Sequence, residues 1–271
     1  MPGPAFERGD GAAEVVFGPR GLAHLYQRTP CRVLFPLAEP GNPPLAALLT
    51  TSGGLAGGDR LSLAVRLEPG AHATVTTAAA EKVYRSLGPD TTVRIALSVE
   101  AGGWLEWLPQ ETILFDQARL DRRIGVALAP GARLLAAETV VLGRAARGER
   151  FDHGLLHEAW RLRIGGKLVW ADALRLDGDI AALLAAPGGF ADATAFATAV
   201  YAGEDAAEHL ALARALAEAG EGGATLVNGI LVARFLGRRS DGVRSALMRY
   251  IAELRSAAGG LPAALPRLWQ A

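Results

Sequence analysis

The feature that most constrains how this chain can fold is a strand pattern that recurs about every thirty residues. Residues 61–67 and 93–99 alternate apolar and polar side chains, which is typical of half-buried β-strands. A glycine follows each such run along the chain. The four glycines are Gly70, Gly102, Gly131 and Gly165, and successive ones are 32, 29 and 34 residues apart. Strand repeats of this length predict a mainly β fold of stacked sheets with β-solenoid (helical) character, in which each unit buries its apolar face against the next.

Each repeat also carries an acidic residue after its glycine. The two copies that begin at Gly131 and Gly165 are the most alike, and both place the acid seven positions after the glycine. The four acids are Glu81, Glu111, Glu138 and Asp172. In a solenoid we expect them to lie in register, one to each coil. A series of single acids suits a path or a string of hydrogen bonds, whereas paired carboxylates would suit the alternative, a carbohydrate-active β-solenoid hydrolase.

The pattern changes after residue 178, where helical periodicity replaces the strands. Residues 204–220 begin with acids and end at a glycine, which predicts a capped helix. Residues 240–254 place apolar side chains on one stripe, which predicts an amphipathic helix. Between them, Asn228-Gly229 interrupts a β-branched run and predicts a hairpin turn. We therefore expect a few α-helices in the C-terminal third of the chain.

No linker divides these parts, so we expect a single domain over residues 1–271, with residues 1–12 as a flexible N-terminal tail. Lys and Arg total 28 and Asp and Glu also total 28, which argues against a basic field for nucleic acid. No uncharged apolar run reaches the ~18 residues of a membrane helix, and the N-terminus lacks a signal peptide pattern. The expected location is the cytoplasm.

Two features of the composition concern solubility and redox state. The single Cys31 cannot form an internal disulfide, and its apolar surroundings predict a buried, inert thiol. A half-apolar chain with a pI of about 7.0 should be poorly soluble alone at neutral pH. This composition indicates that a partner covers part of the surface.

Local motifs for catalysis or tight metal binding fail on their spacing. The glycines of residues 51–60 do not fit a phosphate-binding loop, because a strand rather than a helix follows them. Asp59 in that segment is expected either to cap the turn or to face a cavity. His153 and His157 lie in an extended context that would hold them ~13 Å apart, too far to share a metal ion.

Several motifs occur in a characteristic order along the chain. They are Gly53-Gly-Leu-Ala-Gly-Gly-Asp-Arg60, Glu68-Pro-Gly-Ala71, Ala80-Glu-Lys-Val-Tyr-Arg-Ser86, Leu105-Glu-Trp-Leu-Pro-Gln-Glu111, Leu142-Gly-Arg144 and Leu265-Pro-Arg-Leu-Trp269. Together, from about Thr29 to Trp269, they resemble the urease accessory protein family UreD, called UreH in some systems. No single motif is specific, but the ordered series is.

The resemblance implies a non-enzymatic chaperone and scaffold that joins the UreF/UreG accessory complex to apo-urease and assists nickel insertion into urease. The implied partners are a UreF-like protein, a UreG-like GTPase bound through UreF, and apo-urease, with no nucleic acid and no membrane. The family's mostly β fold with late α-helices agrees with the repeat. No cofactor is expected to bind tightly, although Ni²⁺ could pass in transit.

The resemblance also implies an internal polar tunnel for nickel. On that basis the candidate lining residues are Asp59, Glu81, Glu138 and Asp172. Carboxylates bind Ni²⁺ weakly compared with thiolate or imidazole clusters, which suits transit. The competing interpretation is that each acid caps a turn or pairs with a nearby arginine, for example Glu138 with Arg144 or Arg147. The candidate partner-binding residues form a basic and aromatic cluster, Lys82, Tyr84 and Arg85.

Overall fold

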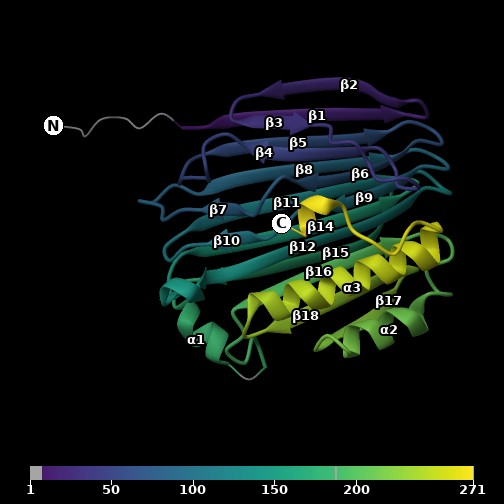
Figure 1. Ribbon diagram of the computed structural model, residues 1–271. Coiled ribbons are helices and arrows are strands. Elements are labelled where there is room, and N and C mark those ends of the chain that lie inside the picture. Colours follow the sequence, from purple (N-terminus) through teal and green to yellow (C-terminus); the bar gives the residue numbers. More distant parts are fainter. Residues whose placement is uncertain (1–7, 187, 271) are drawn as a thin grey trace.

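The computed structural model describes residues 8–186 and 188–270, and in it two β-sheets lie face to face while helices cover the outer face of one sheet (Figure 1). The seven-stranded sheet has the spatial order β15 (Lys167–Asp177), β14 (Leu155–Ile164), β11 (Arg119–Leu128), β8 (Thr91–Val99), β5 (Arg60–Leu67), β1 (Asp10–Gly18) and β2 (Gly21–Arg28). The main path of the eleven-stranded sheet is β17 (Gly222–Val227), β18 (Ile230–Gly237), β16 (Ala195–Ala202), β12 (Arg133–Arg144), β9 (Trp104–Leu108), β6 (His72–Thr77), β4 (Leu45–Thr50) and β3 (Cys31–Leu34). Three short strands complete it, with β10 (Thr112–Leu114) and β13 (Glu149–Arg150) paired to β12, and β7 (Glu81–Val83) paired to β10.

Between β5 and β12 the chain coils from one sheet to the other as a β-solenoid. Strands β5, β8 and β11 pair in parallel in one sheet, and β6, β9 and β12 pair in parallel in the other. Each crossing from the seven-stranded sheet to the eleven-stranded sheet turns at a glycine with positive φ, and these are Gly70, Gly102 and Gly131. The turns stack directly, since Gly70 N donates to Ala101 O at 2.9 Å and Gly102 N donates to Gly131 O at 3.2 Å. The predicted mainly β, solenoid-like fold is confirmed.

The fourth predicted copy, at Gly165, is not a coil of the solenoid. Here both Gly165 and Gly166 have positive φ, and the chain makes a tight hairpin that returns as β15, antiparallel to β14 in the same sheet. Two successive positive-φ residues favour this kind of two-residue hairpin. The expectation that Gly165 begins a fourth unit of the repeat is therefore wrong.

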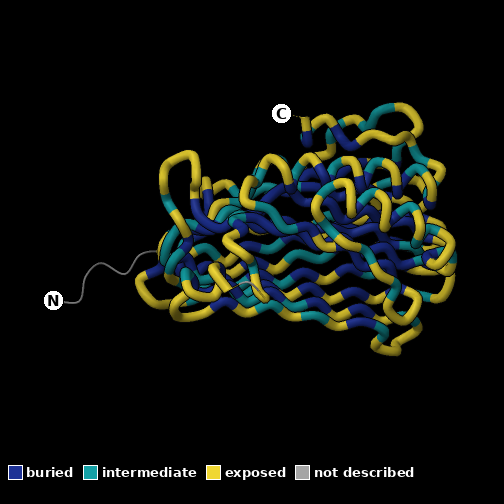
Figure 2. The backbone as a smooth tube through the Cα atoms, turned by 90° about the horizontal axis from the view of Figure 1, so that it is seen from below, coloured by how far each residue is buried: buried dark blue, intermediate teal, exposed yellow. Residues whose placement is uncertain are grey.

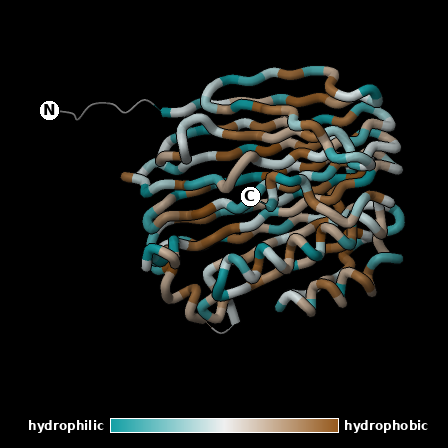
Figure 3. The backbone as a smooth tube through the Cα atoms, viewed as in Figure 1, coloured by the Kyte–Doolittle hydropathy of each residue, from teal (hydrophilic) through white to brown (hydrophobic). Residues whose placement is uncertain are grey.

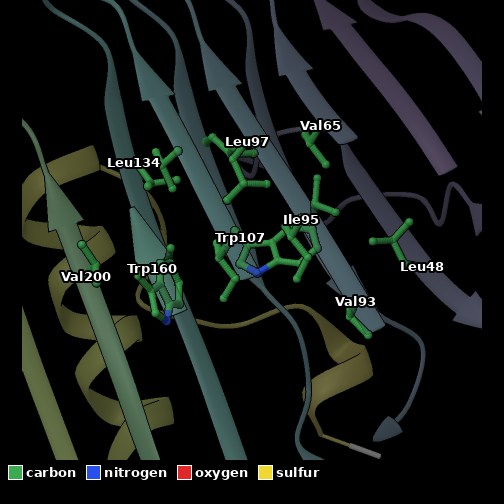
Figure 4. Close-up of a cluster of buried hydrophobic side chains, with 14 of the residues drawn as sticks. Leu48, Val65, Val93, Ile95, Leu97, Trp107, Leu134, Trp160 and Val200 are labelled. Carbon is green, nitrogen blue, oxygen red and sulfur yellow. The ribbon is translucent and has the colours of Figure 1, made fainter. Parts of the chain in front are cut away.

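Apolar side chains of the two sheets fill the space between them. In Figure 3 the strands of the sheets carry hydrophobic stretches, coloured brown. Ile95, Trp107 and Trp160 lie in this inter-sheet core (Figure 4), and Trp107 and Trp160 are each no more than 2% exposed. A second apolar cluster lies on the other face of the eleven-stranded sheet, beneath the C-terminal helices.

The described residues contain three α-helices, α1 (Ile180–Ala185), α2 (Leu210–Glu218) and α3 (Ser240–Gly259), and two 3-10 turns, η1 (Ala145–Arg147) and η2 (Arg267–Trp269). They lie in the C-terminal part of the chain as predicted, except that η1 lies earlier. The amphipathic helix and the hairpin at Asn228-Gly229 are also as predicted, with φ of 49° and 80° at the two turn residues. The helix expected from residue 204 begins only at Leu210, because residues 203–209 form turns in which Asp205 accepts a hydrogen bond from Tyr201.

The N-terminal strand starts earlier than the sequence suggested. β1 begins at Asp10, which lies opposite Arg60 in a parallel pairing with β5. Residues 10–12 thus belong to the sheet and not to a flexible tail, while residues 1–7 of that expected tail lie outside the described residues.

Buried ion pairs hold α3 against the eleven-stranded sheet. Arg255 of α3 and Glu106 of β9, which are 1% and 0% exposed, form two hydrogen bonds of 2.7 and 2.9 Å. The Thr74 hydroxyl donates a further bond to Glu106 at 2.5 Å. About three turns closer to the start of the helix, Arg244 pairs with Glu111. Because both members of the first pair are removed from water, loss of one would leave the other as an uncompensated buried charge.

We expect Arg255→Ala to lower the free energy of unfolding by about 3–5 kcal/mol, because Glu106 would lose its buried counter-charge. Arg249→Ala is the matched control, since Arg249 is exposed on the same helix and should change stability by no more than about 0.5 kcal/mol. Urea denaturation of both variants measures the difference. Equal stability of the two variants would contradict this role of the ion pair.

Candidate functional site

A cluster of charged side chains lies in the otherwise apolar space between the two sheets. Arg122 of β11 pairs with Glu138 of β12 at 2.8 Å and with Glu158 of β14, to which its Nε donates at 2.9 Å. The Thr112 hydroxyl of β10 accepts a further bond from Arg122 at 2.8 Å. The three charged residues are no more than 5% exposed. One guanidinium therefore serves two buried carboxylates.

Two tryptophans complete the hydrogen bonding of these carboxylates. Trp107 Nε1 donates to Glu138 at 2.8 Å, and Trp160 Nε1 donates to Glu158 at 3.4 Å. Burial raises the pKa of Glu138 to about 7, against the opposing effect of the Arg122 charge, and the Glu158 carboxylate raises it further. The cluster thus holds more acid than base in a site with little water.

Glu81 stands where two cavities meet. The inner cavity, about 70 Å³, is lined by Glu81, Thr112, Arg122 and Glu138 among apolar side chains. The outer hollow, about 300 Å³, also has Glu81 in its wall, together with Cys31 and residues 78–80. Leu61, Leu63 and Thr77 line both spaces. Glu81 thus lies in the wall of both spaces, and Glu138 lies in the wall of the inner one.

The electrostatics of the outer hollow follow from burial. Glu81 accepts a hydrogen bond from the Thr50 hydroxyl at 2.8 Å, yet burial raises the pKa of its carboxyl, to which the nearby Asp59 charge adds. Burial likewise raises the pKa of the Cys31 thiol to about 11, with Glu81 contributing. Cys31 is therefore a buried, protonated thiol at neutral pH, in line with the sequence expectation.

The other two predicted lining residues lie apart from the inner cavity. Asp59 is buried, and its two carboxylate oxygens accept bonds from Gly9 N at 2.8 Å and Ala56 N at 2.7 Å. It thus caps the glycine-rich turn, one of the two roles expected for it. Asp172, on the edge strand β15, pairs with Arg234 of β18 and so links the two sheets.

The acids are not in register, contrary to expectation. The residues opposite Glu81 on the neighbouring strands are Thr112 and Val140, so Glu111 and Glu138 are displaced from its row. Glu111 instead pairs with Arg244 of α3. Glu138 pairs with Arg122, while Arg144, one of its two expected partners, pairs with Glu149. The residues two positions after each glycine, His72, Trp104 and Arg133, do lie opposite one another. The acids fall in different rows because Glu81, Glu111 and Glu138 stand 11, 9 and 7 positions after their glycines.

The predicted partner-binding residues adjoin the outer hollow. Lys82 is exposed and lines the hollow, and Arg85 is exposed nearby. Tyr84 has a structural role, since its hydroxyl donates to Gly53 O at 2.9 Å and its ring contacts Phe115 edge-on with the centroids 5.0 Å apart. A side chain on Gly54 would clash with the Tyr84 ring, which explains the close glycine turn at this position.

The histidine pair forms no shared site. His157 lies on β14 and its Nδ1 is 3.0 Å from an Asp121 oxygen, whereas His153 is exposed in the preceding loop. Across residues 8–186 and 188–270, no group of three or more histidine, cysteine or acidic side chains is arranged to hold a metal ion.

The sequence-based prediction did not include Arg122 or its buried partner Glu158. The alternation of buried and exposed residues along their strands could have indicated that both side chains point inward. Arg122 has the same parity as the buried apolar residues Leu120 and Ile124, and Glu158 has the same parity as Trp160. A charged residue at an apolar-face position of a clean alternating strand indicates a buried charge that needs a partner.

The fold and the site together define a class of protein. It is a two-sheet β-solenoid with a buried, partnered carboxylate cluster beside a small cavity, and it lacks in its described part an open cleft at that cluster. None of the described helices is long and apolar enough to span a membrane.

Comparisons with known proteins agree on the family. The profile of the family described as UreD urease accessory protein matches residues 9–270. Similar curated proteins, all named urease accessory protein UreD, include those of Magnetococcus marinus, with 48% identity over 93% of this chain and 89% of the relative, and Rhodopseudomonas palustris strain HaA2, with 48% identity over 90% and 86%. The relative from Granulibacter bethesdensis is 48% identical over 88% of this chain and 99% of its own length. The chain belongs to the UreD family of urease accessory proteins.

The raised pKa of Glu138 predicts a pH dependence of stability. The folded protein binds this proton with a pKa of about 7, against 4.5 for an ordinary glutamate, so its contribution to stability is fully present below pH 4.5 and is lost as the pH rises through 7. This group can lower the free energy of unfolding by up to about 1.4 kcal/mol per pH unit within that window. Urea denaturation at several pH values should show a flatter profile for Glu138→Gln. Glu253→Gln, at an exposed position of α3, should keep the wild-type slope, and equal slopes in both variants would contradict the assignment.

Proposed function

We propose that this urease accessory protein is a non-enzymatic chaperone and scaffold that joins a UreF-like protein and its UreG-like GTPase to apo-urease and assists nickel insertion. In this proposal Ni²⁺ is cargo that passes in transit and is not a resident cofactor, and the protein acts in the cytoplasm. The observation that carries the proposal is the position of Glu81 in the walls of both the outer hollow and the inner cavity, with Glu138 in the wall of the inner cavity, in a chain of the UreD family.

The donor set of the inner cavity suits transit. Glu81, Thr112 and Glu138 lie on the neighbouring strands β7, β10 and β12 and all line the inner cavity. Carboxylate and hydroxyl oxygens bind Ni²⁺ more weakly than thiolates or imidazoles do. Arg122 is one positive charge beside two carboxyl groups, and because the pKa of Glu138 is raised to about 7, that carboxyl is only partly ionised at neutral pH. A cation in the inner cavity would favour its ionised form.

Of the four candidate nickel residues, the proposal now rests on Glu81 and Glu138. Asp59 is bonded to two backbone amides and Asp172 is paired with Arg234, so these acids have structural duties that account for them. Lys82 and Arg85, exposed beside the outer hollow, remain candidates for contact with a partner at its mouth.

The alternative, a carbohydrate-active hydrolase, has no observation in its favour. Glu138 and Glu158 both bind Arg122 in the interior, and a cavity of about 70 Å³ is well below the ~300–1,000 Å³ of ordinary ligand pockets. A sugar ring could not reach these carboxylates without opening the sheets.

A deletion strain complemented with variants tests the proposal. We expect loss of urease activation on deletion, full rescue by the wild-type gene, and severalfold less nickel in urease with Glu81→Gln/Glu138→Gln, because both carboxylates of the inner cavity are removed. The measurements are urease activity and nickel per urease by elemental analysis, together with co-purification of the UreF-like partner.

Asp172→Asn is the matched control, since it removes a carboxylate outside the inner cavity and should leave nickel loading unchanged. Full urease activity in the deletion strain would overturn the accessory function of the chain. Unchanged nickel content in the double variant, with intact complex assembly, would overturn the transit role alone.

Exposed apolar side chains support the expectation that the free protein is poorly soluble. Leu34, Phe35 and Leu37 are exposed at and after the edge strand β3, and Leu22 and Tyr26 are exposed on the edge strand β2. We expect the chain to aggregate alone at neutral pH and co-expression of the UreF-like partner to keep it soluble. Size-exclusion chromatography with light scattering checks this, and a monodisperse free chain would contradict it.

A further inference from the structure

The outward face of the seven-stranded sheet carries an excess of unpaired positive charge. Helices α2 and α3 pack on the other sheet, against β12, β16, β17 and β18. In Figure 2 exposed residues alternate with buried ones along the strands of the layer farthest from the C-terminus. On this layer Ala96, Gly125 and Ala127 are exposed, so the face is open in the described part of the chain.

The charges of this face divide into paired and unpaired groups. Three of its acids already have arginine partners, since Asp10 pairs with Arg28, Asp121 with Arg94 and Arg123, and Asp177 with Arg175. Four other arginines of these strands make no side-chain hydrogen bond or ion pair among the described residues, namely Arg60, Arg66, Arg161 and Arg163. Glu14 is the one unpaired acid on the same strands of the described chain. The neutral total charge of the chain thus conceals a basic face.

Strand register places three of these arginines around a flat floor. Arg66, Ser98, Ala127 and Arg163 lie opposite one another on four successive strands, so the two arginines are three strand spacings, ~14 Å, apart. The neighbouring row on the same face, two residues earlier on each strand, also has small side chains. In it Ala64, Ala96, Gly125 and Arg161 lie opposite one another.

A hollow continues this floor on the side of Arg161. It has a volume of about 400 Å³ and is lined by Arg123, Arg161 and His157, by Trp160 and three alanines, and by Asp172, whose carboxylate pairs with Arg234. The face therefore combines a rigid sheet, short side chains that permit close approach, and guanidinium groups at its border.

We propose that this outward face, bordered by Arg66, Arg161 and Arg163, docks an acidic surface of a partner protein. The inference deepens the proposed function and rests on it for the choice of partners to test. Unpaired guanidinium groups can bind carboxylates in two-point contacts, and arginine is enriched at protein interfaces. The charge complementarity favours association and makes it sensitive to salt.

A protein surface fits this face better than a nucleic acid does. The floor is flat and holds no element that could enter a groove, and single strands bind on aromatic platforms that the rows between Arg66 and Arg163 lack. A flat partner surface can contact both the small side chains and the arginines that border them.

The experiment uses the full chain fused to a solubility tag, because the free chain is expected to aggregate, and measures its affinity for apo-urease and for the UreF–UreG assembly by calorimetry at low and moderate salt. We expect Arg161→Glu/Arg163→Glu to weaken binding to at least one of the two by about tenfold or more and to flatten its salt dependence. Arg161→Lys/Arg163→Lys keeps the charge and should bind within about threefold of wild type.

Arg147→Glu/Arg249→Glu is the matched control, because both arginines are exposed and unpaired in the described chain but lie in η1 and α3. It should bind as wild type does. Circular dichroism and thermal unfolding verify that each variant folds, and Arg66→Glu on β5 gives an independent variant with the same expected loss.

Wild-type affinity of both Glu variants for both partners would overturn this inference and leave the proposed function intact. Failure of the wild-type chain to bind either partner would overturn both. Binding of a DNA duplex that depends on Arg161 and Arg163 at moderate salt would replace the acidic protein with a nucleic acid and so reject the proposal.

Discussion

Parallel pairing of each coil with the next is the constraint on which the rest of this structure depends. The pairing decides which alternate residues of a strand point between the sheets and which point outward. A slip of one residue on β11 would bring Arg122 to the surface and send Arg123 into the core. The stacked turns at Gly70, Gly102 and Gly131 hold that register from coil to coil.

Much of the fold could be predicted from the sequence because short-range chemistry determines it. Alternation and glycine turns gave the strands and the solenoid, and Asn228-Gly229 gave a hairpin. Gly165 misled because the residue after it is also a positive-φ glycine, and two such residues reverse the chain within one sheet. The beginning of α2 was missed because side-chain bonds at Asp205 stabilise turns in its place.

The candidate site could be predicted only in part, because it depends on contacts between distant strands. Glu138 and Asp172 stand at the same offset from a glycine, yet one meets Arg122 in the interior and the other meets Arg234 at an edge. Arg122 is far in sequence from Glu158, and only the solenoid register brings them together. Parity could have marked both as buried, but it could not have named them as partners.

The two buried arginines differ in their charge balance. Arg255 pairs with one carboxylate, and its guanidinium also donates hydrogen bonds to one side-chain amide and two backbone carbonyls. The pair has no net charge and links the helix layer to the sheet. Arg122 meets two carboxylates, which leaves an acidic remainder in the interior. The same type of side chain therefore balances one buried carboxylate in one place and is shared by two in another.

Antiparallel strands close both ends of both sheets, with β2 and β15 bordering one and β3 and β17 bordering the other. The solenoid therefore cannot be extended at its ends without removing these strands. A change in its length must come as a whole coil inserted between β5 and β12. Since Glu81 and Glu138 lie on different coils within that stretch, each coil added between them would move these two acids apart by one strand spacing, ~4.8 Å, so that their separation changes only in whole steps.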